Sequence, residues 1–273
     1  MMRTRTILKI FSMCLFIVFL VLPGFTGSKN SGQRTYTSKW TPRKNIASID
    51  VGGSLSFIQA GYNYEYMDTL WGEDMAISDY VENADALGFS AGAGFYIVES
   101  LEIAASLNIF SKSLDGTYGF SLPNIYLWND IASDEAEANP FFKETVFSLM
   151  VNFHPVTSGS LRPFVGAGIS YISGKMDLLY DIIYEETFYW DWTHDIDIAE
   201  IEFEKTNVNK LGFNVSGGMD FYITNRVAFY ASGRYIIAKR EVEHPLTTQW
   251  EEGETLELDL GGLSANLGIK VFF

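Results

Sequence analysis

Every second residue is apolar over residues 263–273, at the end of the chain. The apolar positions are Leu263, Ala265, Leu267, Ile269, Val271 and Phe273. The positions between them are small or polar up to Lys270. A period of two over this length predicts a β-strand whose two faces lie in different environments. A strand of about ten residues with one apolar face is also what a transmembrane β-barrel requires.

Seven earlier segments alternate in the same way. They are residues 48–57, 87–97, 101–109, 144–153, 164–171, 211–221 and 227–237. Together with 263–273 they predict an all-β fold, an eight-stranded antiparallel transmembrane β-barrel. An even number of strands places both chain ends on the same side of the barrel.

The connections between these segments alternate between short and long. The links after the second, fourth and sixth segments are only a few residues, whereas those after the first, third, fifth and seventh are long. Short periplasmic turns and long extracellular loops are the layout of outer-membrane barrels. Within the long connections, residues 176–192 and 195–205 keep alternating, which predicts that the fifth and sixth strands continue as a projecting hairpin. Residues 124–138 are interpreted as a short helix.

Charge separates the strands from the long connections. The chain has 34 Asp and Glu against 19 Lys and Arg, a net charge of −15, and most acidic residues fall in the long connections. This balance argues against nucleic-acid binding, which needs a basic surface. The single cysteine, Cys14, lies in the N-terminal apolar run. A chain without that run would have no thiol chemistry and no disulfide.

The N-terminus has the order of a secretory signal peptide. Basic residues Arg3, Arg5 and Lys9 precede an apolar run that is short for a spanning helix, and small residues follow. We therefore expect residues 1–27 to be a signal peptide, residues 28–45 a polar, basic periplasmic segment, and residues 46–273 the barrel domain. Segment 28–45 is either a tail or a strap that folds back on acidic groups of the barrel.

Two glycine-rich segments resemble a known family. They are Arg162-Pro163-Phe164-Val165-Gly166-Ala167-Gly168-Ile169 and Leu211-Gly212-Phe213-Asn214-Val215-Ser216-Gly217-Gly218-Met219-Asp220. With Arg234-Tyr235 and the terminal Phe273, they resemble the strands of small eight-stranded outer-membrane barrels of the OmpW/OmpA-like group. The resemblance covers residues 46–273. It implies insertion in the outer membrane, next to lipid and lipopolysaccharide, by a barrel-insertion machinery that reads the strand ending in Phe273.

The polar faces of the strands predict a charged lumen. Eight residues are expected to face it: Asp50, Glu102, Glu144, Arg162, Lys210, Asp220, Arg234 and Lys270. An eight-stranded barrel has room inside only for side chains or one small ligand. The charges therefore form either a salt-bridged plug or a narrow conduit for small or hydrophobic molecules. Asp50 and Lys270 are predicted to be neighbours where the first and last strands meet.

Candidate catalytic groups are few. His154 is expected at a short-turn boundary, and His194 and His244 in acidic loops. His194 with Asp191, Asp195 and Asp197 could form an acid–base pair or a metal site, but an acidic loop creates such neighbours by chance. No phosphate-binding loop, Cys/His cluster or nucleophile elbow occurs.

The sequence thus predicts no cofactor, no metal and no enzymatic activity. The function it favours is a structural or surface-interaction role for a monomeric barrel that presents acidic, aromatic loops. The alternatives are a narrow channel and, less favoured, a hydrolase.

Overall fold

The computed structural model describes residues 46–70, 73–124, 126–127, 130–248 and 255–273. The expectations for the signal peptide, Cys14 and the basic segment 28–45 lie outside these residues. Among the residues described, no helix is long and apolar enough to cross a membrane.

Eight strands of the described chain form a closed barrel. They are β1 (Ala47–Ile58), β4 (Ala84–Val98), β5 (Leu101–Ser113), β8 (Phe141–Phe153), β9 (Leu161–Phe188), β10 (His194–Tyr222), β11 (Val227–Ile237) and β14 (Gly262–Phe272). Their order around the ring is β1-β14-β11-β10-β9-β8-β5-β4, and every neighbouring pair is antiparallel. Each of the eight predicted segments lies in one of these strands, apart from Phe273, which follows the last residue of β14, so the predicted fold is confirmed.

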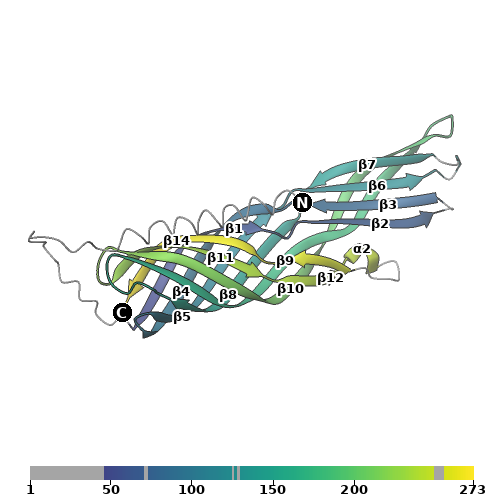
Figure 1. Cartoon of the computed structure of the whole chain (residues 1–273). Helices are drawn as coiled ribbons and strands as arrows, with labels where there is room; N and C mark the ends of the chain where they lie inside the picture. The colour runs from purple at the N-terminus through teal and green to yellow at the C-terminus, as the bar shows by residue number, and fades with distance from the viewer. Residues whose placement is uncertain (1–45, 71–72, 125, 128–129, 249–254) are drawn as a thin grey trace, which may run out of the picture. The chain divides into compact units, whose positions relative to one another are not determined.

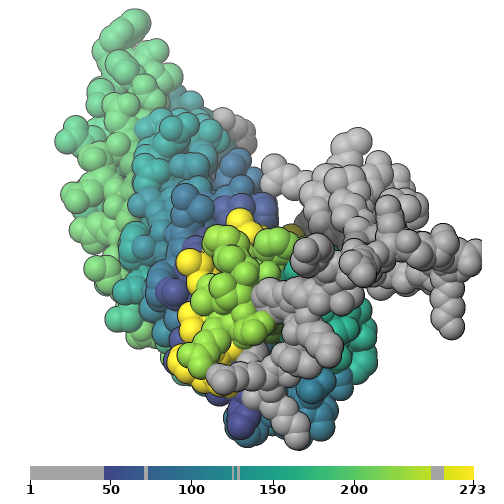
Figure 2. Space-filling model, turned by 90° about the vertical axis from the view of Figure 1, so that its left-hand side faces the viewer, coloured from purple at the N-terminus to yellow at the C-terminus, as the bar shows by residue number. Residues whose placement is uncertain are grey.

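The barrel closes where the first and last strands pair. Asp50 lies directly opposite Lys270, and Val51 opposite Ile269. Directly opposite residues of an antiparallel pair point to the same face. The predicted Asp50–Lys270 neighbourhood is therefore confirmed. Figure 2 shows the yellow residues of β14 between its yellow-green and purple neighbours.

The outward face of the barrel strands is apolar and exposed. Leu87, Phe213 and Leu267 are each at least two-thirds exposed, while alternate residues such as Ser90, Asn214 and Asn266 are buried. A soluble domain would not leave a continuous apolar belt in water. This inverted distribution is that of a transmembrane barrel, whose outer face contacts lipid and whose interior is polar.

The long connections continue as β-structure instead of irregular loops (Figure 1). One four-stranded sheet has the order β2-β3-β6-β7, and β12 pairs with β13. The bounds are β2 (Tyr62–Leu70), β3 (Glu73–Val81), β6 (Gly116–Pro123), β7 (Ile131–Ala138), β12 (Lys239–Glu243), helix α2 (Pro245–Thr248) and β13 (Thr255–Asp259). The prediction of a short helix within residues 124–138 is wrong, because Ile131–Ala138 forms strand β7 and pairs along its whole length with β6.

The predicted projecting hairpin is confirmed. Strands β9 and β10 stay paired as far as Phe188 and His194, well beyond Met176, where β9 loses its other neighbour, β8. Two register shifts, at Ile198/Glu200 and Glu202/Phe203, interrupt this pairing. Bulges of this kind bend a strand and re-aim its side chains.

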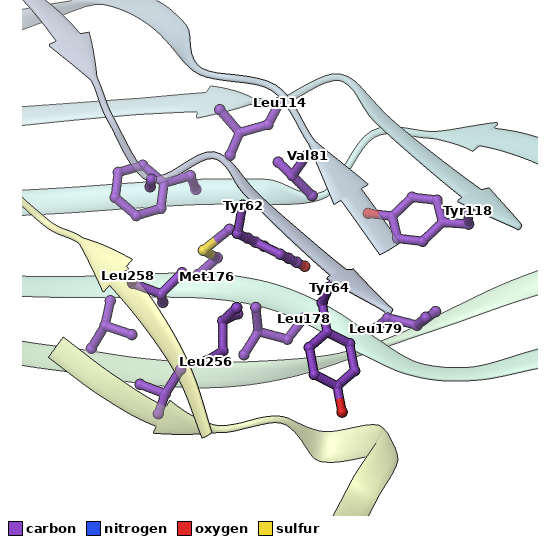
Figure 3. Close-up of a cluster of buried hydrophobic side chains, with 14 of the residues drawn as sticks. Tyr62, Tyr64, Val81, Leu114, Tyr118, Met176, Leu178, Leu179, Leu256 and Leu258 are labelled. Carbon is purple, nitrogen blue, oxygen red and sulfur yellow. The ribbon is translucent and has the colours of Figure 1, made fainter. Parts of the chain in front are cut away.

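An apolar core fills the end of the barrel that carries the long connections (Figure 3). It includes Tyr62, Tyr64, Val81, Leu114, Tyr118, Met176, Leu178, Leu179, Leu256 and Leu258. These residues come from β2, β3, β6, β9 and β13 and from the segment after β5. Burying a side chain such as Leu178 contributes about 1.5–3 kcal/mol. The connections are therefore held together by a hydrophobic core of their own, continuous with the inside of the barrel.

Candidate functional site

Four charged or ionisable side chains meet inside the barrel near its short-turn end. Lys270 Nζ lies 2.8 Å from Glu102 Oε1 and 3.6 Å from Asp220 Oδ2, and His154 Nε2 lies 3.2 Å from Glu102 Oε2. All four residues are buried. We call Glu102, His154, Asp220 and Lys270 the charge cluster.

Glu102 is the acceptor at the centre of the charge cluster. Its Oε1 also accepts a hydrogen bond from Ser48 Oγ at 3.2 Å, and its Oε2 accepts one from Asn152 Nδ2 at 3.1 Å. Desolvating a carboxylate is costly unless it is paired and hydrogen-bonded. Both oxygens of Glu102 have two partners, so this charge is tolerated in the barrel interior.

Aromatic rings lie next to the charge cluster at the same end. The rings of Tyr222 and Phe272 stack with centroids 4.7 Å apart, and Tyr96 lies 6.3 Å from Phe272. The Arg162 guanidinium lies over the Tyr222 ring at 4.2 Å. Arg162 is thus half-buried on an aromatic face, although its strand position is directly opposite Asp220. These rings narrow the interior at the short-turn end.

A layer of hydrogen-bonded polar side chains fills the middle of the barrel. Arg234, which is buried, donates to Ser148 Oγ at 3.1 Å and to Ser106 Oγ at 2.7 Å. Asn108 Nδ2 donates to Asn266 Oδ1 at 3.1 Å. The cavity left between this layer and the charge cluster measures about 50 Å³. A space of that size holds a few water molecules and no organic substrate.

Five of the eight predicted lumen residues line this one cavity. They are Asp50, Glu102, Asp220, Arg234 and Lys270. Glu144 is buried elsewhere, on the same face of β8 as the apolar Phe142 and Val146. Arg162 lies on Tyr222, as described above.

Lys210 does not face the interior of the barrel, so its predicted lumen position is wrong. It stands opposite the buried Ile172 of β9, yet its own side chain is exposed. On its other side, β11 pairs with β10 only from Phe213 onward. Beyond the end of the β10–β11 pairing, the long Lys210 side chain reaches water instead of entering the lumen.

His154 belongs to the charge cluster, and the sequence reasoning missed it. It was expected only as a boundary residue, because Pro155 follows and the apolar alternation ends at Phe153. The signal that could have found it is its even position, shared with the inward-facing Met150 and Asn152. A backbone hydrogen bond from His154 N to Ser100 O, 2.8 Å long, holds it at the rim of the barrel.

A second buried polar group lies among the long connections. Tyr62 donates to Asp79 Oδ2 at 2.7 Å, and His244 Nε2 lies 3.2 Å from the same oxygen. The His244 ring stacks on Tyr64 with centroids 4.2 Å apart. Burial raises the pKa of Asp79, although the hydrogen bonds from His244 and Tyr62 oppose the shift. Burial, and next the charge of Asp79, raise the pKa of Tyr62 well above its ordinary value.

His194 lies between two carboxylates. Its Nδ1 is 3.5 Å from Asp130 Oδ2 and its Nε2 is 3.8 Å from Glu186 Oε1. These are not the residues Asp191, Asp195 and Asp197 that the sequence suggested. Within the described part of the chain, no group of three or more His, Cys, Asp or Glu side chains is placed to hold a metal ion.

The comparisons with known proteins find similar folds at low sequence identity. No protein-family model matches the chain, and no curated protein sequence matches it. Among solved structures, OprG from Pseudomonas aeruginosa is 9% identical with a TM-score of 0.46, over 84% of this chain and 96% of that one.

Two further solved structures are similar in the same way. Neisserial surface protein A is 11% identical with a TM-score of 0.45, over 83% of this chain and 97% of that one. Outer membrane protein W of Escherichia coli is 14% identical with a TM-score of 0.35, over 84% and 98%. The strand pairing of this chain by itself closes the ring of eight strands.

Proposed function

We propose that this protein is an integral outer-membrane β-barrel with a closed lumen, and that its role is to present the β-structure of its long connections outside the cell. The single observation that carries the proposal is the filled interior. From the short-turn end outward, aromatic rings, the charge cluster, a polar layer and an apolar core follow one another, and the cavity among them measures about 50 Å³.

The filling argues against the conduit that the sequence left open. A conducting pore needs a continuous wet path, whereas the buried Phe142, Ile172 and Met176 occupy the interior beyond the polar layer. Opening such a path would expose a packed core to water and leave Glu102 or Lys270 without partners.

The long connections have the rigidity that a presented surface needs. Binding surfaces on ordered scaffolds lose less conformational entropy when a partner associates. Here strands β2, β3, β6 and β7 form one sheet, and β9 and β10 form a long paired hairpin. Among their exposed residues, Asp and Glu outnumber Lys and Arg, which suits a partner outside the cell other than a nucleic acid.

The membrane partners follow from the same proposal. The apolar outer face of the strands contacts lipid, and lipopolysaccharide is the lipid of the outer leaflet. Phe273 is exposed at the end of the chain, directly after the buried Phe272. We infer that this exposed terminal aromatic is what a barrel-insertion machinery binds, after export directed by residues 1–27. The proposed role is structural and interactive, and it is not enzymatic.

Planar-bilayer recording of the purified protein tests the closed lumen. The expected result is the absence of reproducible channels in preparations whose insertion is verified independently by protection of the barrel from protease. Reproducible unitary conductance from the parent protein would overturn the proposal in favour of a conduit. Fractionation of cells that produce the protein tests the location, because the proposal requires it in the outer-membrane fraction.

A further inference from the structure

Two separate connections are joined at the end of the β9–β10 hairpin. Asn124, directly after β6, donates through Nδ2 to Asp130 Oδ2 and to the carbonyl oxygen of Trp192, both at 2.7 Å. Its Oδ1 accepts hydrogen bonds from the backbone N–H groups of Tyr126 and Leu127. We call Asn124, Tyr126, Asp130 and residues 184–198 the hairpin tip. Asn124 fixes its two parts to each other.

The hairpin tip exposes a group of aromatic rings. Trp190 is 94% exposed, Trp192 is 60% exposed and Tyr126 is 58% exposed. Tyr126 contacts Phe188 and Trp192, with centroids 5.5 Å apart in both pairs. Large rings clustered in water mark an interaction surface, because leaving them solvated has no structural benefit.

Trp192 is held in a conformation that ordinary residues avoid. Its φ angle is +71°, the only positive φ of a non-glycine residue in the described chain. The left-handed region is sterically unfavourable for a bulky side chain. Hydrogen bonds from Trp192 N to Tyr189 O, at 3.1 Å, and from Asn124 to Trp192 O hold the turn in place. The turn thus keeps a tryptophan where glycine would be favoured.

The hairpin that carries these rings is rich in carboxylates. Residues 176–204 contain ten Asp and Glu and no Lys or Arg. Glu185 lies directly opposite Asp197, and Asp181 directly opposite Glu202, all four of them exposed. Like charges directly opposite each other destabilise a strand pair. Thr193 donates a hydrogen bond to Asp191 that lowers the pKa of this carboxyl, so the charge at the turn persists.

A buried histidine with unmet hydrogen bonds lies under this surface. The His194 side chain is fully buried, both of its ring nitrogens lack a hydrogen-bond partner, and the carboxylates of Asp130 and Glu186 lie 3.5 and 3.8 Å away. These distances are too long for hydrogen bonds. The hairpin tip in its free form therefore contains both uncompensated negative charge and an unsatisfied polar group.

We propose that the hairpin tip is a docking site for an arginine- and lysine-rich segment of a partner protein. The inference rests on the proposed function, since it names the partner class of the presented surface. Guanidinium groups stack on Trp190, Trp192 and Tyr126 through cation–π contacts and pair with the flanking carboxylates. A cationic chain lying along the hairpin offsets the repulsion between Glu185 and Asp197, and between Asp181 and Glu202.

The geometry favours an extended cationic segment over a single metal ion. The exposed carboxylates are spread along both strands of the hairpin, and the described residues contain no convergent group of three or more metal-binding side chains. Anionic lipid headgroups are disfavoured by the same charge. Because the rings lie next to the carboxylates, the site requires a partner that supplies both positive charge and flat contact surface, as arginine does.

The test measures binding of synthetic peptides to the full protein in detergent micelles. The probes are an alternating Arg-Gly peptide and an alternating Glu-Gly peptide of equal length. The parent protein is expected to bind the Arg-Gly peptide, more weakly as salt increases, and not the Glu-Gly peptide. The double variant Trp190→Ala/Trp192→Ala is expected to lose about tenfold in affinity, as is Glu185→Gln/Asp197→Asn.

Matched controls separate the hairpin tip from general acidity. Tyr80→Ala removes an exposed ring from β3, and Glu241→Gln/Glu243→Gln removes two charges from β12; both are expected to bind like the parent. Equal binding of the two peptides, or parent-like binding by the tip variants, would overturn the inference. Complete displacement of the bound Arg-Gly peptide by Ca²⁺ alone would also overturn the inference. If the protein forms no channels in bilayers but fails to bind the Arg-Gly peptide, only this inference is contradicted. Channel formation, by contrast, contradicts the proposed function.

Discussion

Lys270 Nζ and Glu102 Oε1 lie 2.8 Å apart in the interior of the barrel, although 168 residues separate them along the chain. Lys270 is on β14 and Glu102 is on β5, which are not neighbouring strands. The contact therefore crosses the lumen and depends on complete closure of the ring.

Breaking this contact is expected to destabilise the barrel strongly. Lys270→Met leaves the buried Glu102 carboxylate without its main cation, at a cost of about 3–5 kcal/mol in the free energy of unfolding. Urea-induced unfolding in lipid bilayers measures the change. The matched control is Lys239→Met, which removes an ion pair with Glu257 at a site where both side chains are 57% exposed. That variant is expected to unfold like the parent, and equal losses in both variants would contradict the assigned importance of the cross-lumen contact.

A glycine makes room for the same carboxylate. A Cβ added at Gly94 would overlap Glu102 Oε1 and lie 2.6 Å from Ser48 Oγ, so Gly94→Ala displaces Glu102 from its partners. The expected loss is about 1–3 kcal/mol in the free energy of unfolding. Gly53→Ala, on β1, is the control, because a Cβ there meets nothing within 4 Å. If both variants unfold at the same urea concentration, Glu102 has freedom to move that the structure does not indicate.

Two adjacent phenylalanines distinguish the packed interior from the outer face. Phe142 is fully buried in the apolar core, whereas Phe141 is 41% exposed. We expect Phe142→Ala to cost about 3–5 kcal/mol through lost burial and the cavity it leaves. Phe141→Ala, one residue away on the same strand, is expected to cost far less in the same urea unfolding measurement. A reversed order would mean that the inward and outward faces of β8 are exchanged at this point.

The buried Asp79 makes stability depend on pH. Its pKa is raised in the folded protein by burial, so the folded state binds more protons than the unfolded state between the unfolded pKa of about 3.9 and the higher folded pKa. The contribution of protonated Asp79 to the free energy of unfolding is fully present below that unfolded pKa. It is lost as pH rises through the folded pKa.

The variant Asp79→Asn isolates this contribution. Relative to the parent, it is expected to gain stability as pH rises from 4 upward, because asparagine carries no charge to bury and its Oδ1 still accepts the Tyr62 hydrogen bond. Chemical unfolding of parent and variant at a series of pH values measures the difference. A difference that is constant across the series would show that Asp79 titrates alike in the folded and unfolded protein.

The sequence alone determined the barrel. Strict alternation in eight segments identifies each strand and its two faces, because a period of two sends successive side chains to opposite sides. Alternating connection lengths indicate which end carries the short turns. Inward positions can be counted along each strand from the same alternation. This count predicted Asp50 beside Lys270 and placed Glu102, Asp220 and Arg234 inside the barrel.

Tertiary structure decided what those positions contact. Which inward charges meet depends on strand stagger and closure of the ring, and neither is encoded in one strand's alternation. His154 joins Glu102, Arg162 stacks on Tyr222, and Lys210 turns outward where β11 no longer covers it. The pairing of β6 with β7 and the bridge from Asn124 to Trp192 join segments far apart in the chain. Such long-range contacts depend on how separate elements pack, and local propensity carries no information about them.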